Sequence, residues 1–271
     1  MPSCFSCFGG SRKSNPSVDD SCADNENCEM HTALERNSYG SFITCDAVDE
    51  TNIASPVLDS LLPEVIQRGR ENMELMIDMM VNKAGFVANG KIGETSLWYI
   101  NRSSTGIPPI ALGEILFQLY DVAELGKVIM DLDNKGKWDS EFLKGEVISK
   151  VNISDEAVYR KTWAAMKPKA GVAGRDFVYH TLTRTTSDSF CVVSWSVDDL
   201  DVPPEYVSRS SGHVRGRIIL AGFLVRRMTS QNTLTVNYLN HVNVGISGWL
   251  SDPVVKRTPQ VLNGLRKYIS S

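Results

Sequence analysis

The feature that most constrains the fold is a run of strand-like segments that fills the second half of the chain and ends in one helix. The segments are rich in β-branched and aromatic residues, and turn residues such as Pro168, Gly171 and Pro203 separate them. Strands that follow one another without intervening helices pair mostly antiparallel. The predicted strands in this half cover residues 143–152, 157–166, 177–183, 190–197, 215–228 and 233–250.

Helices are predicted on both sides of this run. Residues 61–84 and 253–269 carry apolar side chains at three- and four-residue spacing, which is typical of amphipathic helices. We therefore expect an α+β fold in which a curved antiparallel sheet wraps a long C-terminal helix and leaves room for a pocket between them. The remaining predicted elements are strands at 95–101 and 110–119 and short helices at 121–130 and 134–140.

The first residues of the chain have a different composition. Residues 1–57 are dominated by Ser, Asn, Asp and Gly without a sustained apolar period, so we predict a disordered tail followed by one domain at 58–271. Five of the six cysteines lie in the first 45 residues, which does not fit a disulfide scaffold. Cys4 and Cys7 stand beside aromatic residues, and either S-palmitoylation of both or an inert tail fits this pattern.

Several classes of protein are disfavoured. A net charge of −4 argues against a nucleic-acid binder. No apolar run is long enough to span a bilayer and no secretory signal is recognisable, so we expect a cytoplasmic protein that the tail could place at a membrane. The sequence has no nucleophile elbow, no phosphate-binding glycine loop and no metal-ligand spacing among its histidines. We therefore expect neither an enzyme nor a cofactor or metal.

Three local motifs carry a resemblance to a known family. Arg-Asp-Phe-Val at 175–178 follows a proline-bearing loop, Asp-Leu-Asp at 131–133 precedes Lys-Trp-Asp at 137–139, and Gly-Trp-Leu at 248–250 precedes the last helix. In this order they resemble the START family over residues 63–269. The resemblance implies a helix-grip fold, an internal cavity for one lipid, a lid made of the loop 166–174 and the C-terminal helix, and no chemistry on the ligand.

The resemblance also implies candidate ligand-binding residues. Lys135 and Asp139 match the charged pair that meets the lipid phosphate in the phosphatidylcholine-transfer member, although a solvated helix pair is the alternative. Trp163 and Phe177 match two of three aromatic positions that cage choline there, or are plain core. The third position is Ile219, which leaves the cage incomplete.

Further candidates come from the sterol-binding members and from the strand pattern. Thr162 and Thr181 occupy the positions of a buried acid and arginine in the sterol carriers, so the ion pair is absent but two hydroxyls remain. Asn240 and Glu114 each interrupt an apolar face, where a polar group needs a partner such as a lipid headgroup or a backbone carbonyl.

Three residues are candidates for the lid. Arg175 and Asp176 either fix the lid loop near the mouth of the pocket or form a structural ion pair. Gly264 within the last helix either softens the lid or allows close packing. The basic residues of this helix could contact anionic headgroups or could form a solvated face: Lys256, Arg257, Arg266 and Lys267.

The leading functional prediction is a monomeric carrier that holds a single lipid, phospholipid rather than sterol, and transfers it between membranes through transient contact with their surfaces. The alternative is a membrane-tethered lipid sensor or adaptor that binds lipid without net transfer. An enzyme on the same hollow fold would need an acid or base in the cavity, for which Glu114 and His180 are the candidates.

Overall fold

The computed structural model of this chain describes residues 56–100, 107–118, 120–168, 172–208, 212–228, 233–245 and 252–271. Side chains are described throughout these ranges except at 56–61 and 252–256. The predictions for Cys4 and Cys7, for the tail up to residue 55 and for the motif at 248–250 lie outside these residues.

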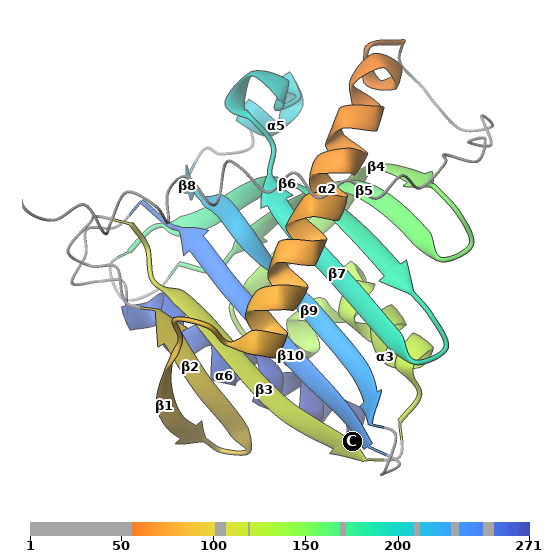
Figure 1. Cartoon of the computed structure of the whole chain (residues 1–271). Helices are drawn as coiled ribbons and strands as arrows, with labels where there is room; N and C mark the ends of the chain where they lie inside the picture. The colour runs from red at the N-terminus through yellow and green to blue at the C-terminus, as the bar shows by residue number, and fades with distance from the viewer. Residues whose placement is uncertain are drawn as a thin grey trace, which may run out of the picture. The chain divides into compact units, whose positions relative to one another are not determined.

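One curved sheet forms the body of the molecule (Figure 1). Its strands follow the order β1-β2-β3-β10-β9-β7-β6-β5-β4, and all neighbours on this path pair antiparallel. The short strand β8 pairs parallel with the start of β6. The strands are β1 (Val87–Ile92), β2 (Thr95–Ile100), β3 (Ile110–Gln118), β4 (Phe142–Asn152), β5 (Ala157–Met166), β6 (Gly174–Thr185), β7 (Ser189–Ser196), β8 (His213–Arg215), β9 (Arg217–Met228) and β10 (Thr233–Asn243).

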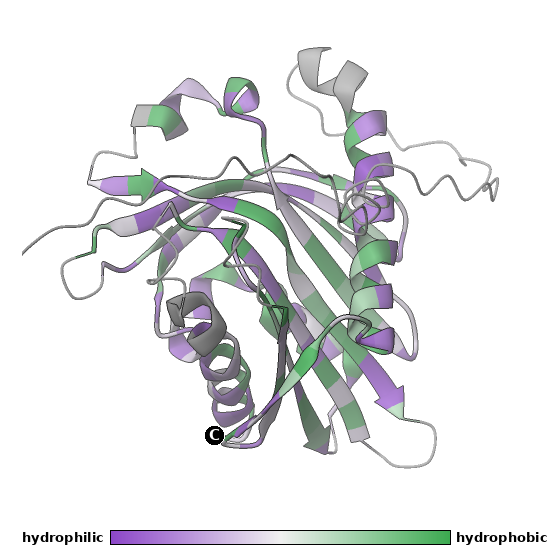
Figure 2. Cartoon of the chain, turned by 60° about the vertical axis from the view of Figure 1, so that its left-hand side comes forward, coloured by the Kyte–Doolittle hydropathy of each residue, from purple (hydrophilic) through white to green (hydrophobic). Residues whose placement is uncertain are grey.

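Helices cover both faces of the sheet. α2 lies across one face, whereas α3, α4 and α6 lie on the other, so that the sheet separates α2 from α6 (Figure 2). The curved antiparallel sheet and the long C-terminal helix confirm the predicted helix-grip fold. The helices are α2 (Pro56–Asn82), α3 (Val122–Met130), α4 (Leu132–Trp138), α5 (Pro204–Ser208) and α6 (Asp252–Ile269), with a 3₁₀ turn η2 (Asp199–Asp201).

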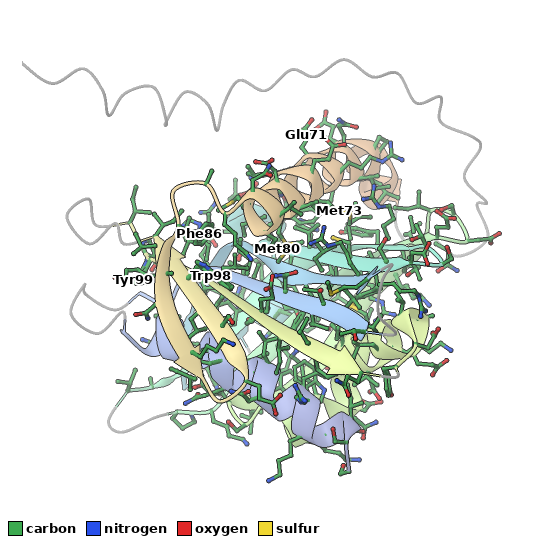
Figure 3. All side chains as sticks on the ribbon, turned by 60° about the horizontal axis from the view of Figure 1, so that its bottom comes forward. Glu71, Met73, Met80, Phe86, Trp98 and Tyr99 are labelled. Carbon is green, nitrogen blue, oxygen red and sulfur yellow. The ribbon has the colours of Figure 1, made fainter. Side chains whose placement is uncertain are left out.

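The apolar face predicted for residues 61–84 packs on the sheet, and three methionines form much of it. Met73, Met76 and Met80 are buried against the sheet, and Figure 3 shows Met73 and Met80 on the sheet side of the helix with Glu71 on the outer side. Methionine adapts to irregular gaps, which suits a helix lying on a curved surface. At Gly69 an added Cβ would lie 2.7 Å from the ring of Trp195, so this turn of α2 approaches the sheet closely.

The helix α6 packs on α4 as well as on the sheet. Val261, Leu262 and Leu265 are buried in a hydrophobic cluster that also contains residues of α3, β3 and β10. A Cβ added at Gly264 would overlap the carbonyl oxygen of Trp138 at the end of α4. Of the two roles considered for Gly264, close packing therefore fits its position, with α4 rather than the sheet as the neighbour.

Differences from the predicted elements lie at the ends of elements, in the exposed strand β1 and in two short helical elements after β7. The strand β1 was missed because all of its residues are exposed, which leaves no apolar alternation to detect. β10 ends at Asn243 rather than at residue 250, and α2 begins at Pro56, five residues before the predicted start. The short elements η2 and α5 were also not predicted.

Candidate functional site

A cavity of about 280 Å³ lies between the concave face of the sheet and the layer of α3, α4 and α6. This is near the lower end of the range of roughly 300–1,000 Å³ typical of ligand pockets. Alternate residues of β5, β6, β7 and β10 line it, because successive side chains of a strand point to opposite faces. From the central strands these are Thr162, Ala164, Met166, Phe177, Tyr179, Thr181, Val192, Ser194, Tyr238, Asn240 and Val242.

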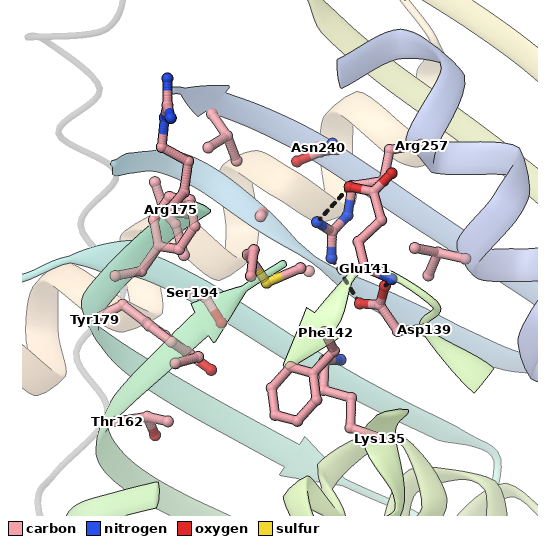
Figure 4. Close-up of a pocket in the computed structure, with 18 of the residues that line it drawn as sticks. Lys135, Asp139, Glu141, Phe142, Thr162, Arg175, Tyr179, Ser194, Asn240 and Arg257 are labelled. Carbon is pink, nitrogen blue, oxygen red and sulfur yellow. Dashed lines mark hydrogen bonds and ion pairs between the residues drawn. The ribbon is translucent and has the colours of Figure 1, made fainter. Parts of the chain in front are cut away.

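A cluster of charges forms one part of the cavity wall. Asp139 caps the C-terminus of α4, and its Oδ2 lies 2.6 Å from Nη2 of Arg257 on α6. Nη1 of the same guanidinium lies 3.2 Å from Oε2 of Glu141, so that Arg257 sits between the two carboxylates (Figure 4). Burial is the largest single influence on the pKa of Arg257 and lowers it, but Asp139, Tyr238 and Glu141 together outweigh burial, so the pKa of Arg257 is raised.

Lys135 lines the same wall without an ion pair among the described residues. Its Nζ lies 4.1 Å from the centre of the Trp138 ring. Burial lowers the pKa of Lys135 to about 8, an effect that Asp139 opposes and Arg257 reinforces. Its side chain retains exposed surface because part of it faces the cavity. The solvated helix pair considered for Lys135 and Asp139 is therefore wrong, since both line the cavity and Asp139 pairs with Arg257.

The hydroxyl and amide candidates also lie at the cavity. Thr162, Thr181 and Asn240 are buried residues of β5, β6 and β10 that line it. Oγ1 of Thr181 lies 3.2 Å from Oγ of Ser194 on β7. Whether these groups bind a ligand stays a prediction.

The aromatic cage expected from the resemblance is not assembled. Phe177 lines the cavity, but Trp163 packs on the opposite face of β5 with Val178 and Tyr206. Its indole Nε1 donates a hydrogen bond to Oδ2 of Asp176 at 3.1 Å. The strand register explains this, because Phe177 is paired with Ala164 and not with Trp163. Ile219 is likewise 40 % exposed on the far side of β9.

Arg175 and Asp176 are consecutive residues of β6 and therefore point to opposite faces. Arg175 lines the cavity, and its Nε donates to the carbonyl oxygen of Val244 at 2.6 Å, which ties β6 to the end of β10. Asp176 is fully buried and accepts two hydrogen bonds from Arg215 of β8, at 3.0 and 2.9 Å. The structural ion pair thus exists, but the partner of Asp176 is Arg215.

The two candidates for an acid or base lie on the α2 face of the sheet. Glu114 pairs with Nζ of Lys83 at 3.0 Å and accepts a hydrogen bond from Asn237 at 2.9 Å. Nδ1 of His180 lies 2.7 Å from the hydroxyl of Tyr159, and burial, followed by nearby positive charges, lowers the pKa of His180 to about 4. Neither lines the cavity, so placing Glu114 at the ligand was wrong.

The sequence analysis missed several cavity residues. Arg257 was considered for membrane contact but points inward, and Glu141, Arg160, Tyr179 and Ser194 were not considered. Arg160, Tyr179 and Ser194 could be predicted from strand alternation once another residue of the same strand is known to face the cavity. The pairing of Glu141 with Arg257 has no signal in the sequence. The other described basic residues of α6 remain near the surface: Arg266 pairs with Glu94, and Lys267 is exposed.

Within the described residues, no helix combines the length and apolar character needed to cross a membrane. A search of curated proteins found no match to this sequence.

Comparison with solved structures shows the fold. Human StAR-related lipid transfer protein 5 superposes with a TM-score of 0.61 at 19% identity, covering 77% of this chain and 97% of that one. Human STARD10 gives 0.59 at 15% identity, with 74% and 80% covered. A fragment of a STAR-related lipid transfer protein from Xanthomonas axonopodis gives 0.53 at 18% identity, with 69% and 99% covered.

The sequence model of the START domain matches residues 67–264, which is most of the chain and includes every residue that lines the cavity. Together with the sheet order and the cavity beneath α6, this match establishes that the chain belongs to the START domain family.

Proposed function

We propose that this protein holds a single lipid, a phospholipid rather than a sterol, in the cavity and transfers it between membranes without altering it chemically. The observation that carries the proposal is the arrangement of the wall: apolar side chains line most of the cavity, and charged residues interrupt them, above all the cluster of Lys135, Asp139, Glu141 and Arg257. This is the division that an amphiphile with one polar end requires.

The apolar part of the wall supports the holding of an acyl chain. Removing a chain from water contributes about 0.8 kcal/mol for each buried CH₂ group. Met166, Phe177, Val192 and Ile218 supply much of this surface. The acyl chain of the lipid therefore contributes most of the binding free energy, and the polar residues of the cavity select the lipid headgroup.

The charged cluster favours a phospholipid over a sterol. A buried cation is costly unless another group compensates it, and Lys135 has the field of Asp139 and the face of the Trp138 ring but no ion pair among the described residues. A phosphate can pair with Lys135, whereas the single hydroxyl of a sterol cannot neutralise its charge. The sterol-binding members of the family carry a buried acid and an arginine at the positions of Thr162 and Thr181. The absence of this ion pair here also favours a phospholipid over a sterol.

Release of the ligand requires α6 to move, because this helix closes the cavity opposite the sheet. The contacts that resist this movement include the pairing of Arg257 with Asp139 and Glu141. Phosphates at an anionic membrane surface compete for such a guanidinium, so contact with the membrane promotes opening.

The direct test is to purify the full chain, determine bound lipid by native mass spectrometry, and measure transfer from labelled donor vesicles to unlabelled acceptors. Ala221→Phe fills the cavity and should abolish loading and transfer, whereas Ala88→Phe on the exposed strand β1 is the matched control. Loading without transfer would favour the sensor or adaptor. An empty protein that takes no lipid from vesicles contradicts the proposal.

We further propose that residues 1–57 form a tail outside the lipid-binding domain at 58–271, and that acylation of Cys4 and Cys7 places a cytoplasmic protein at a membrane. The support is the sequence alone: two cysteines beside aromatic residues, in a segment that lacks the pattern of a folded domain. Replacing both cysteines by serine should move the protein from the membrane to the supernatant fraction.

A further inference from the structure

The ionisable residues that line the cavity have the opposite charge balance to the chain. The chain carries a net charge of −4. The cavity is lined by the carboxylates of Asp139 and Glu141 and by five basic side chains, which are Lys135, Arg160, Lys167, Arg175 and Arg257. A positive lining in an acidic protein is an electrostatic match for an anion.

A row of five paired residues, four of them polar, crosses the cavity floor from strand to strand. Arg160 on β5 is paired with Thr181 on β6, which is paired with Ser194 on β7. Ser194 is paired with Ala221 on β9, and Ala221 with Asn240 on β10. All five line the cavity. Since neighbouring strands lie about 4.8 Å apart, the row extends over roughly 19 Å, with Arg160 at one end.

Arg160 is the arginine of the cavity wall whose donors are least used. Arg257 has two carboxylates and Arg175 binds backbone carbonyls. Within the described residues, Arg160 forms no ion pair, its one hydrogen bond runs from Nη1 to the carbonyl oxygen of Met130 at 3.3 Å, and its buried Nε has no partner. A buried donor left without a partner destabilises the empty protein, and an incoming anion can remove that cost by accepting its hydrogen bond.

The surroundings of Arg160 supply further donors for such an anion. The Tyr179 side chain lines the cavity one pleat away on β6, and burial raises its pKa, which keeps the phenol protonated and able to donate. The hydroxyls of Thr181 and Ser194 lie next to Arg160 in the row. Burial also lowers the pKa of Arg160, consistent with a cation that lacks a compensating carboxylate.

We propose that Arg160, assisted by Tyr179 and Thr181, binds an anionic group of the ligand, a phosphate or a carboxylate, so that the cargo is an acidic lipid rather than a zwitterionic one. This deepens the proposed function and rests on it. The anionic group then meets Arg160 as well as Lys135, which lines the same cavity, whereas the charge of Arg257 is already compensated by Asp139 and Glu141.

The test uses the full chain and vesicles of phosphatidylcholine that contain a minor fraction of phosphatidic acid with the same acyl chains. Native mass spectrometry then reports the ratio of the two lipids on the protein. We expect the wild type to enrich phosphatidic acid, and Arg160→Gln to lose this enrichment by about tenfold or more, the size expected of a hydrogen bond to a charged group. Arg184→Gln removes the same charge from an exposed position of β6 and should leave the enrichment unchanged.

Arg160→Lys guards against a variant that fails to fold, because it keeps the charge and should retain part of the enrichment. A wild type whose bound lipids mirror the vesicle composition, or an Arg160→Gln variant that still enriches phosphatidic acid, overturns the inference while leaving lipid binding intact. Absence of any bound lipid overturns the proposed function instead. The last measurement adds inorganic phosphate alone. If phosphate stabilises the protein through Arg160 but phosphatidic acid is not enriched, the site at Arg160 binds a free anion, and the proposal of an acidic lipid as cargo is overturned.

Discussion

Oδ2 of Asp139 lies 2.6 Å from Nη2 of Arg257, although 118 positions separate the two residues in the sequence. Asp139 ends α4 and Arg257 belongs to α6, so the pair joins the two helices that close the cavity. The side chains are 2% and 19% exposed, and the remaining exposure of Arg257 is directed to a cavity that it lines. One contact thus contributes both to the stability of the fold and to the polar end of the site.

Asp139→Asn should lower the free energy of unfolding by about 3 kcal/mol. This is the lower end of the range for removing one partner of a buried ion pair, and it applies because Glu141 still pairs with Arg257 in the variant. Urea unfolding followed by tryptophan fluorescence measures this. Asp155→Asn, in an exposed turn between β4 and β5, is the control and should change stability by less than about 0.5 kcal/mol. Equal effects would show that the pair adds no stability.

Gly264→Ala should destabilise the protein by about 1–3 kcal/mol even though alanine favours helices, because the added Cβ overlaps the Trp138 carbonyl oxygen and forces α6 away from α4. Gly136→Ala in α4 is the matched control, since its Cβ would meet no atom closer than 3.8 Å. That control should be neutral or stabilising by up to about 1 kcal/mol. Thermal unfolding of both variants decides between packing and helix propensity.

Acidification should destabilise the protein through His180. Its pKa is about 4 in the folded state, owing first to burial and then to Lys161 and Arg68. The unfolded chain, with a histidine pKa near 6.5, binds the proton first, so stability is lost as the pH falls from about 6.5 to about 4. Between about pH 7 and pH 5 this contributes about 2 kcal/mol. In urea unfolding, His180→Asn should lose about 2 kcal/mol less stability than the wild type over this pH range. An identical pH dependence in the two proteins would contradict the assignment of this effect to His180.

The affinity for an anionic lipid should fall as the pH rises through about 8 and above, because Lys135 then loses its proton. A bound anion stabilises the ammonium form, so the midpoint in the complex lies above that of the empty protein. Lys135→Arg keeps its charge throughout this range. Dissociation constants measured at about pH 7 and about pH 9 should differ several-fold for the wild type and stay constant for the variant. Parallel curves would show that Lys135 does not contact the head.

The order of elements could be predicted from the sequence because each one buries a periodic apolar face. The strand at Ala157–Met166 was predicted to the residue, and the stripe of Met73, Met76 and Met80 identified the buried side of α2. β1 shows the limit of this reasoning, since a strand with every residue exposed carries no period.

Which face of a strand meets the cavity was decided only by the tertiary structure. Trp163 and Phe177 are both aromatic residues of adjacent strands, but the register pairs Phe177 with Ala164 and leaves Trp163 on the other face. A shift of one residue exchanges the two faces of a strand, and local sequence does not specify that shift. Glu114 was misplaced for the same reason.

The resemblance pointed to Lys135, Thr162 and Thr181, each by its position along one element. All three line the cavity, and ligand binding by them stays a prediction. The partners of Asp139 and Asp176 could not be predicted in this way. Each pairs with an arginine from a distant segment, Arg257 and Arg215, and such pairs depend on how α6 and β8 close over the sheet. The sequence by itself determined the periodic faces of helices and strands, which are local; the tertiary structure decided the charge partners and the cavity, which arise only where separate elements meet.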